Sequence, residues 1–312
     1  MKIFRSFAVV FFTLLYGAPL SASELNCVGF GSINFLKVEN EEKIKKCLVQ
    51  VSDEEFFKIH SNGNNLPMNA VVAGVEAKLL SAILSNYQSE DLEAALKHRN
   101  FEDLSIAHLG AVSENGARLL IELSSWGTDF NMLKDKQDGT LFSADRGWSA
   151  LHYAIDRKSS FENILALLSV GIDVNLLDKN GNSALNFVVS KEERYDVISL
   201  ILSWTDDYTQ NDKGYGALHF ASQKVTDEDN LKLIFQMIDE GYHDDVTSND
   251  ETVLHLSAAA AKSPEVFEVI LSISEDFKCD KDKKDAQAID YARKNPNISS
   301  SKQVLDLQNS CD

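Results

Sequence analysis

The sequence has no apolar run long enough to span a membrane. The run at residues 7–18 has twelve residues, whereas a transmembrane helix needs roughly 20. Two cations, Lys2 and Arg5, precede this run, and small residues follow it at 21–23. A basic start, a short apolar stretch and a small-residue end are typical of a secretory signal peptide. We therefore expect residues 1–23 to direct export and to be removed, which leaves no stable membrane anchor.

Cations are scarce. The chain has 30 lysines and arginines against 48 aspartates and glutamates, a net charge of −18 with histidine neutral. Removal of residues 1–23 takes away only Lys2 and Arg5, so the net charge becomes about −20. Nucleic acid and anionic membranes are poor partners, because no cluster of cations remains to meet phosphate groups. A cationic protein is the partner that this charge favours, although acidity can equally serve solubility alone.

The motifs that mark common active sites are also missing. There is no glycine-rich phosphate loop, no Gly-x-Ser-x-Gly nucleophile turn and no His-Glu-x-x-His metal motif. The acidic turns at 178–181 and 280–285 lack the glycine and the late glutamate of a calcium loop, so we expect ordinary solvated turns. The sequence thus predicts no catalytic residue, no metal and no cofactor.

Cysteine is limited to four residues, which lie beyond residue 23 in two groups near the two ends of the chain: Cys27, Cys47, Cys279 and Cys311. In an oxidising compartment this arithmetic indicates two disulfides. Neither group has the short spacing of a zinc site, and no histidine stands beside either. No activating neighbour identifies a catalytic thiol.

The sequence does contain an internal repeat. The stretch DKNGNSALNF at 178–187 is a polar turn that runs into an apolar helix start. Similar turns stand at 145–152, 212–219 and 249–255. The leucines after these turns are 34, 33 and 36 residues apart: Leu151, Leu185, Leu218 and Leu254. A short helical stretch follows each leucine, and then an apolar pair at helical spacing, such as Ile164 with Leu167. This pattern predicts a turn and two helices, repeated.

At these residues the chain resembles the ankyrin repeat. The family signature is a Gly-x-Thr-Pro-Leu-His turn and helix start, a second helix with Val-x-x-Leu-Leu, and a Gly-Ala-Asp-x-Asn exit, which 127–131 and 171–175 resemble. Weaker copies stand at 66–84 and 106–123. The resemblance implies an all-α ankyrin-repeat solenoid of stacked helix-turn-helix units with β-turn fingers, about six repeats plus an N-terminal half repeat.

The resemblance also implies how the chain is divided. We expect an N-terminal capping half repeat at 24–62, ankyrin repeats at 63–284 and a C-terminal capping repeat at 285–312. A terminal repeat has one apolar face without a neighbour, so fraying begins there. We predict that Cys27 pairs with Cys47 and Cys279 with Cys311, because each bond then closes a short loop at one cap.

Two departures from the signature bear on stability and binding. Alanine or valine replaces the proline of the helix starts, at Ala150, Ala184, Ala217 and Val253. Proline there is helpful but not required, so the fold is expected to survive with some loss of stability. The first two repeats are longer than the others, 39 and 44 residues by the same leucine count. The longest insertion, near 131–140, predicts an extended finger that can carry binding.

Histidine recurs at one repeat position, in His152, His219 and His255. Stacked repeats would hold these side chains on the order of 10 Å apart, too far for one metal or catalytic site. In the resembling family this histidine hydrogen-bonds the turns between repeats, and Asn186 and Asp290 are polar replacements at the same position. We expect a structural role.

Two classes of function stay open. The resemblance implies a non-enzymatic scaffold that binds another protein on its concave surface, and the exported form is similar to periplasmic ankyrin-repeat proteins of Gram-negative bacteria. We expect a monomer in the periplasm or the secreted fraction. The alternative is a secreted effector or inhibitor, or an exported enzyme, whose activity resides in the finger 131–146 or in the N-terminal segment 27–65.

The resemblance places turn residues and the ends of first helices in the concave groove. The expected partner-binding residues are Asp145, Arg146, Trp148, Asp156, Arg157, Lys179, Asn180, Asn182, Lys191, Asp212, Lys213, Tyr215 and Lys224. Trp148 and Tyr215 are the expected hot spots, since buried Trp, Tyr and Arg most often dominate interface energy. The alternative is that both rings merely cover neighbouring turns. A second aromatic set, Tyr153, Phe187 and Phe220, is assigned to the core.

Overall fold

The structure, a computed structural model, describes residues 26–134, 147–191, 194–206, 208–238 and 240–311. Within these ranges the regular elements are helices, and the β-structure consists of isolated bridges such as that between Lys134 and Trp148. The chain divides into two compact units, Met1–Met132 and Leu133–Asp312. The predicted signal peptide lies outside the described residues.

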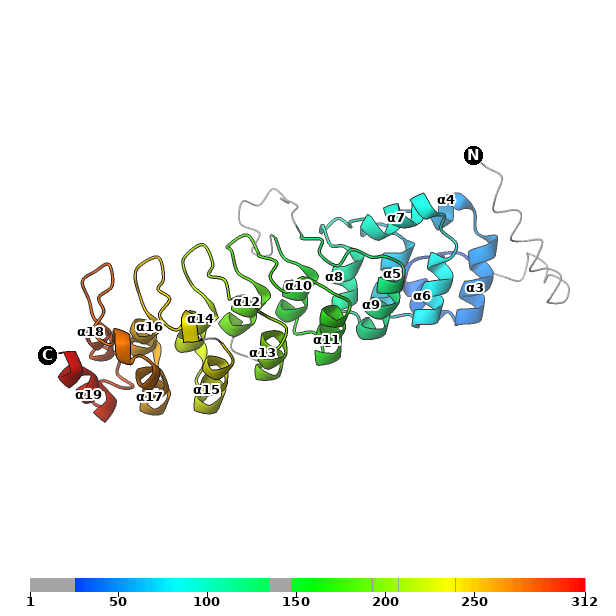
Figure 1. Ribbon diagram of the computed structural model, residues 1–312. Coiled ribbons are helices and arrows are strands. Elements are labelled where there is room, and N and C mark those ends of the chain that lie inside the picture. The colour runs from blue at the N-terminus through cyan, green and yellow to red at the C-terminus, as the bar shows by residue number, and fades with distance from the viewer. Residues whose placement is uncertain (1–25, 135–146, 192–193, 207, 239, 312) are drawn as a thin grey trace. The chain divides into compact units, whose positions relative to one another are not determined.

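The first unit contains three helix pairs among its described residues. The pairs are α2 (Ile33–Val38) with α3 (Glu41–Gln50), α5 (Leu66–Ala73) with α6 (Ala77–Leu84), and α8 (Ile106–Ala111) with α9 (Gly116–Ser125). The first helices α2, α5 and α8 contact one another in order, and so do α3, α6 and α9, which gives two layers (Figure 1). Two further helices, α4 (Asp53–Phe56) and α7 (Ser89–Lys97), lie in the connections.

The predicted N-terminal half repeat includes a first helix, α2. Ser32 caps this helix, because its hydroxyl accepts a hydrogen bond from the Phe35 N–H at 3.2 Å. Phe35 and its neighbour Leu36 are buried. A disulfide joins Cys27, in the segment before α2, to Cys47 on α3, with the Cα atoms 5.8 Å apart. This is the predicted pairing, and it connects the segment before α2 to the second helix of the pair.

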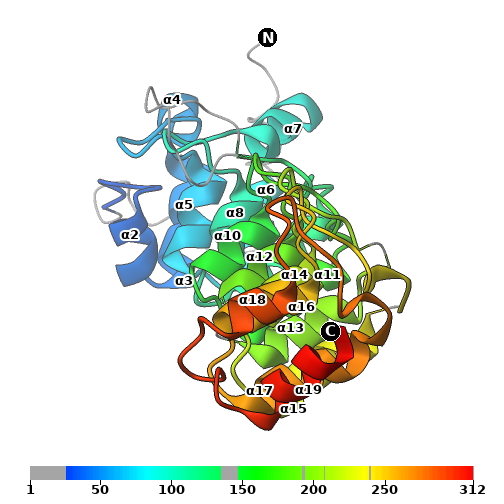
Figure 2. The same cartoon turned by 90° about the vertical axis from the view of Figure 1, so that its left-hand side faces the viewer.

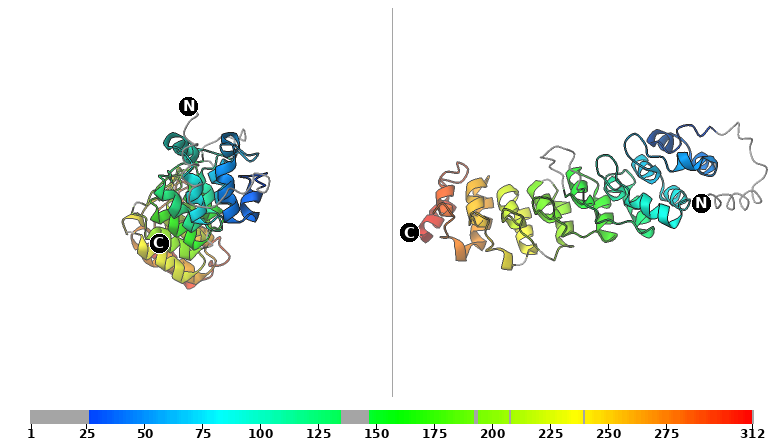
Figure 3. Two further views of the ribbon diagram at one scale, coloured as in Figure 1. Left: turned by 90° about the vertical axis from the view of Figure 1, so that its right-hand side faces the viewer. Right: turned by 90° about the horizontal axis from the view of Figure 1, so that it is seen from above.

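The second unit contains five helix pairs in the residues that the structure describes. They are α10 (Ala150–Asp156) with α11 (Phe161–Ser169), α12 (Ala184–Lys191) with α13 (Tyr195–Leu202), α14 (Ala217–Lys224) with α15 (Glu228–Met237), α16 (Val253–Ala260) with α17 (Pro264–Ile273), and α18 (Ala288–Ala292) with α19 (Lys302–Cys311). Consecutive first helices contact each other, and so do consecutive second helices. The pairs follow one another in sequence order (Figure 3).

Local sequence explains where these helices begin. Ser149 caps α10, Ser160 caps α11 and Thr252 caps α16, each with its hydroxyl accepting from a backbone N–H of the first turn. A small residue such as Ala150 follows and is fully buried, so that neighbouring first helices approach closely. The second helices carry large aliphatic side chains, including the buried Ile164 and its partners. Burial of each such side chain stabilises the stack by about 1.5–3 kcal/mol.

The polar turn at 178–182 folds around one carboxylate. Asp178 Oδ1 accepts hydrogen bonds from the N–H groups of Asn180, at 2.8 Å, and Asn182, at 2.9 Å. Gly181 has a φ of +76°, and a Cβ there would lie 2.9 Å from the backbone nitrogen of Asp212 in the next turn. The Asp212 N–H donates to the Asn180 carbonyl at 3.0 Å, so each finger is bonded to the next. The turn is thus one copy of a repeated structural element.

The C-terminal pair closes the second unit. Val304 and Leu307 of α19 are buried, and α19 contacts α17 in the layer of second helices (Figure 2). Cys279, in the preceding finger, bonds to Cys311 at the end of α19, with the Cα atoms 5.4 Å apart. The second predicted pairing is therefore also the one that the structure contains.

Candidate functional site

Three buried histidines of the second unit join each first helix to the next finger. In His152, His219 and His255, Nδ1 lies 3.1–3.4 Å from a backbone N–H at the start of the same helix. Because Nδ1 accepts from an amide, Nε2 carries the ring proton and donates it to a carbonyl group. The acceptors are the carbonyl oxygens of Asn182 at 3.1 Å, Asp245 at 3.0 Å and Ala286 at 3.1 Å. The predicted structural role is confirmed.

Burial disfavours the charged form of His219 and His152. It lowers the pKa of His219 to about 4, against an opposing effect of the Asp245 carbonyl and of Glu251. It also lowers the pKa of His152. Asn186 stands at the equivalent position of α12 and donates from Nδ2 to the Thr209 carbonyl at 2.9 Å. An amide therefore makes the same bond between repeats without titrating.

In the acidic turns, the aspartate carboxylates accept hydrogen bonds from backbone N–H groups of the same turn. Asp282 repeats the pattern of Asp178: its Oδ1 accepts from the N–H groups of Lys284 at 2.8 Å and Ala286 at 3.0 Å, and its Oδ2 accepts from the Tyr291 hydroxyl at 2.5 Å. Among the described residues, no group of three or more His, Cys, Asp or Glu side chains is placed to hold a metal ion. In the same part of the chain, no helix is long and apolar enough to cross a membrane.

Trp148 is not a surface residue, contrary to the expectation for a hot spot. Its side chain is only 6% exposed, and its ring meets that of Phe187 edge to face with the centroids 5.2 Å apart. Phe187 belongs to the next repeat, so the tryptophan at the base of one finger packs on the following first helix. A large ring gains more from this burial than from exposure to water. Tyr153 and Phe187 are buried as predicted, but Phe220, which was assigned to the same core set, is only partly buried.

Tyr215 is partly buried. Its ring lies 5.5 Å from that of Phe220 and 5.9 Å from that of His219, measured between centroids. Burial raises the pKa of its hydroxyl group, and the nearby Glu251 carboxylate adds to this increase. Tyr215 therefore covers part of its own repeat and presents only one side to solvent, which fits the alternative reading better than a free aromatic anchor.

The side chain of Asn182, which was expected to contact a partner protein, is hydrogen-bonded within the repeats. Its Nδ2 donates to the Asp178 carboxylate at 3.1 and 3.2 Å, and its Oδ1 accepts from Asn211 Nδ2 at 2.8 Å. If Asn182 broke these bonds to contact another protein, the side chains of Asp178 and Asn211 would each lose a hydrogen bond. The other predicted residues of these two turns are exposed: Lys179, Asn180, Asp212 and Lys213. Asp145 and Arg146 lie outside the described residues.

The predicted residues at the ends of the first helices lie on the surface. Arg157, Lys191 and Lys224 are exposed and Asp156 is half-buried. Lys191 Nζ lies 3.3 Å from Asp156 Oδ1 of the preceding repeat and 4.8 Å from the centroid of the Phe187 ring. The Arg157 guanidinium lies 5.1 Å from the centroid of the Tyr153 ring. Successive repeats thus present cations that rest on aromatic rings.

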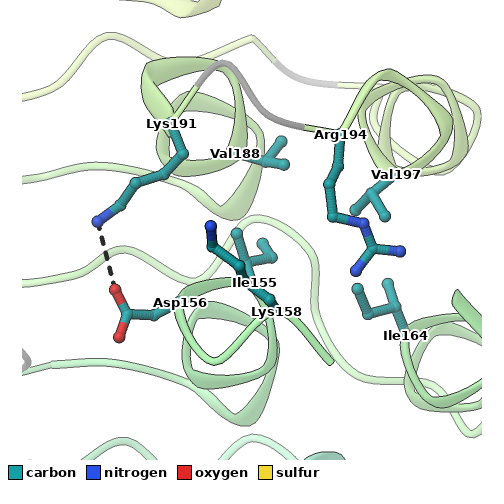
Figure 4. Close-up of a pocket in the computed structure, with 8 residues that line it drawn as sticks. All are labelled: Ile155, Asp156, Lys158, Ile164, Val188, Lys191, Arg194 and Val197. Carbon is teal, nitrogen blue, oxygen red and sulfur yellow. Dashed lines mark hydrogen bonds and ion pairs between the residues drawn. The ribbon is translucent and has the colours of Figure 1, made fainter. Parts of the chain in front are cut away.

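A pocket of about 270 Å³ opens between two of these repeats (Figure 4). Its lining residues are Ile155, Asp156, Lys158, Ile164, Val188, Lys191, Arg194 and Val197. The structure brings together the predicted Asp156 and Lys191, and adds Lys158 and Arg194, which the sequence reasoning missed. No local motif marks Arg194, since its place in the pocket follows from the packing of α13 against α11.

Comparison with known proteins agrees with this architecture. A family model for ankyrin repeats in many copies matches residues 151–202, which span most of α10 to α13. The crystal structure of the ankyrin repeat domain of Bcl-3, a member of the IkappaB family, is 18% identical and has a TM-score of 0.56. That match covers 76% of this chain and 96% of the Bcl-3 chain. The fold is an ankyrin-repeat fold.

A second structural match comes from a bacterial complex. It is a structure of a predatory endopeptidase from Bdellovibrio bacteriovorus with an immunity protein, 19% identical, with a TM-score of 0.50. The match covers 65% of this chain and 96% of the matched chain. No curated protein matches the sequence. At these identities the two structures support the fold alone, and the surface residues are interpreted from this chain.

Proposed function

We propose that the chain is a non-enzymatic, exported ankyrin scaffold that holds another protein on the first-helix side of its second unit. The observation that carries this proposal is that the polar side chains fall into two groups, one bonded within the repeats and one exposed at the surface. The histidines, Asp178 and Asn182 are bonded within the framework. The charged ends of the first helices, in contrast, surround a pocket between repeats and face solvent. Ankyrin arrays use such surfaces to bind proteins.

Two further observations support parts of the proposal. The chain matched by the structure from Bdellovibrio bacteriovorus belongs to a complex between two proteins, so this fold occurs there in a protein assembly. Two disulfides support an oxidising compartment, such as the periplasm or the secreted fraction. We further propose that the scaffold acts as a monomer, with a partner whose identity is open.

An affinity capture with matched variants tests the function. The chain without residues 1–23 serves as bait for proteins of the exported fraction, identified by mass spectrometry after cross-linking. The test variant is Arg157→Glu combined with Lys191→Glu. The control is Lys302→Glu on α19, which is also exposed but lies in the layer of second helices. We expect one protein to be retained by the natural chain and the control, and to be reduced at least tenfold on the double variant.

Two results would overturn the proposal. Equal recovery of every protein on all three baits would remove the first-helix side as the binding surface. Turnover of general peptidase, esterase or phosphatase substrates by the same purified chain, unaffected by further purification, would contradict the non-enzymatic assignment. The finger at 131–146 would then be the first segment to delete, because long loops of repeat proteins carry activity most easily.

A further inference from the structure

The pocket between the α10–α11 and α12–α13 pairs has an apolar interior and a charged rim. Ile155, Ile164, Val188 and Val197 form the aliphatic part of its lining. Its volume of about 270 Å³ is below the roughly 300–1,000 Å³ of sites that enclose a cofactor or a drug-sized ligand. A site of this size suits one aliphatic side chain together with a small polar group.

The charges at the rim are unusual for this chain. Three of the four ionisable groups that line the pocket are cationic, Lys158, Lys191 and Arg194, and only Asp156 is anionic. The chain as a whole has a net charge of −18. Glu192 and Glu193, between two of these cations in the sequence, lie outside the described residues. The described lining therefore has the opposite charge to the protein, which favours an anionic group at this position.

Two of the three cations, Arg194 and Lys191, are held in place by contacts within and between the repeats. Arg194 donates from Nη1 to the Ser159 carbonyl, and its Nη2 lies 3.3 Å from the Asp196 carboxylate. Lys191 is held by Asp156 of the preceding repeat and by the Phe187 ring. Figure 4 shows Lys191 and Arg194 on opposite sides of the pocket with Lys158 between them in this view. Donors fixed in this way lose little freedom when they bind a carboxylate.

We propose that this pocket recognises an aliphatic side chain flanked by a carboxylate in the partner protein. The aliphatic group fills the apolar interior, and the carboxylate accepts hydrogen bonds from the lysines and the arginine of the rim. This inference rests on the proposed protein-binding function and specifies the chemistry of one contact. Although the overall acidity favours a cationic partner, this contact requires a local anion, which fixes the register of the partner on the array.

Blocked peptides test this chemistry without knowledge of the partner. The probe has five residues, with one leucine between two glutamates, and two comparison peptides replace the glutamates by glutamine or the leucine by alanine. Binding to the chain without residues 1–23 is measured by NMR titration. We expect millimolar binding of the probe, and each comparison peptide to bind at least tenfold more weakly.

A charge variant links the binding to the pocket. Lys191→Gln keeps the aliphatic stem and is expected to weaken binding of the probe at least fivefold, while Lys302→Gln on α19 leaves the affinity unchanged. Lys191 is exposed, so unchanged melting temperatures for both variants are expected. Equal affinity for the glutamate and glutamine peptides would overturn the proposal, and so would the lack of any shift up to 10 mM probe.

The peptide test and the capture test fail in different ways. If the peptides do not bind but the Arg157 and Lys191 variant still loses a captured protein, only the chemistry assigned to the pocket is wrong. If the peptides bind in the pocket but no captured protein depends on this surface, the chemistry assigned to the pocket is supported and the proposed scaffold function is wrong.

Discussion

Replacing His219 with asparagine is expected to make unfolding less sensitive to acid. The side chain is 1% exposed, and burial lowers its pKa in the folded state to about 4. In the unfolded chain the same group titrates near 6.5, so below that pH the unfolded state binds a proton that the folded state does not. The contribution of neutral His219 to stability is therefore fully present above pH 6.5, and it is lost progressively as the pH falls toward 4.

The size of the effect follows from these two pKa values. Between pH 7 and pH 5, proton binding to the unfolded state lowers the free energy of unfolding by about 2 kcal/mol at this single site. His219→Asn removes this contribution. Asparagine can keep the bond to the next finger, because Asn186 makes the equivalent bond from the same position of α12.

Urea unfolding of both proteins at pH 7 and pH 5, followed by circular dichroism, measures the effect. We expect the loss between the two pH values to be about 2 kcal/mol smaller in the variant, since all other titrating groups are shared. Asn186→His is the reciprocal control, and it should increase the loss. Equal losses in all three proteins would refute the assignment of His219 as a buried, acid-sensitive group.

Three further predictions concern stability. Dithiothreitol should lower the melting temperature, because each disulfide contributes about 2–4 kcal/mol. Peptide mapping should show the bond between Cys279 and Cys311 to be reduced first, because Cys279 is exposed whereas the cysteine on α3 is buried. Cross-pairing between the two ends would contradict this account. Trp148→Ala should destabilise the chain by about 3–5 kcal/mol in chemical denaturation, whereas Tyr215→Ala should cost clearly less, and equal small losses would return Trp148 to the list of binding residues. Gly181→Ala should cost about 1–3 kcal/mol in the same assay, since its φ of +76° and the backbone of the next finger leave no room for a Cβ, and an unchanged midpoint would contradict this reading of the turn.

Much of the architecture could be predicted from the sequence, because each repeat is built from local signals. A polar turn, a small residue and a leucine recur at nearly constant spacing, and a second apolar stretch follows each time. Every repeat contacts chiefly its neighbours, so these local patterns are enough to specify the helix pairs. The two extra helices α4 and α7 were not predicted. α7 lies in the added length of a repeat that the sequence showed only as longer.

The candidate site depended much more on tertiary structure. Trp148 and Lys179 both belong to polar turns and look equally available in the sequence, yet packing on Phe187 buries the first and leaves the second exposed. Lys158 and Arg194 carry no motif and lie 36 residues apart, but the pocket includes both. Sequence patterns determine which face of a helix is apolar. Only the contacts between neighbouring repeats decide which polar or aromatic side chains become buried or hydrogen-bonded between repeats. These contacts depend on the distance and orientation of groups that lie a whole repeat apart in the sequence.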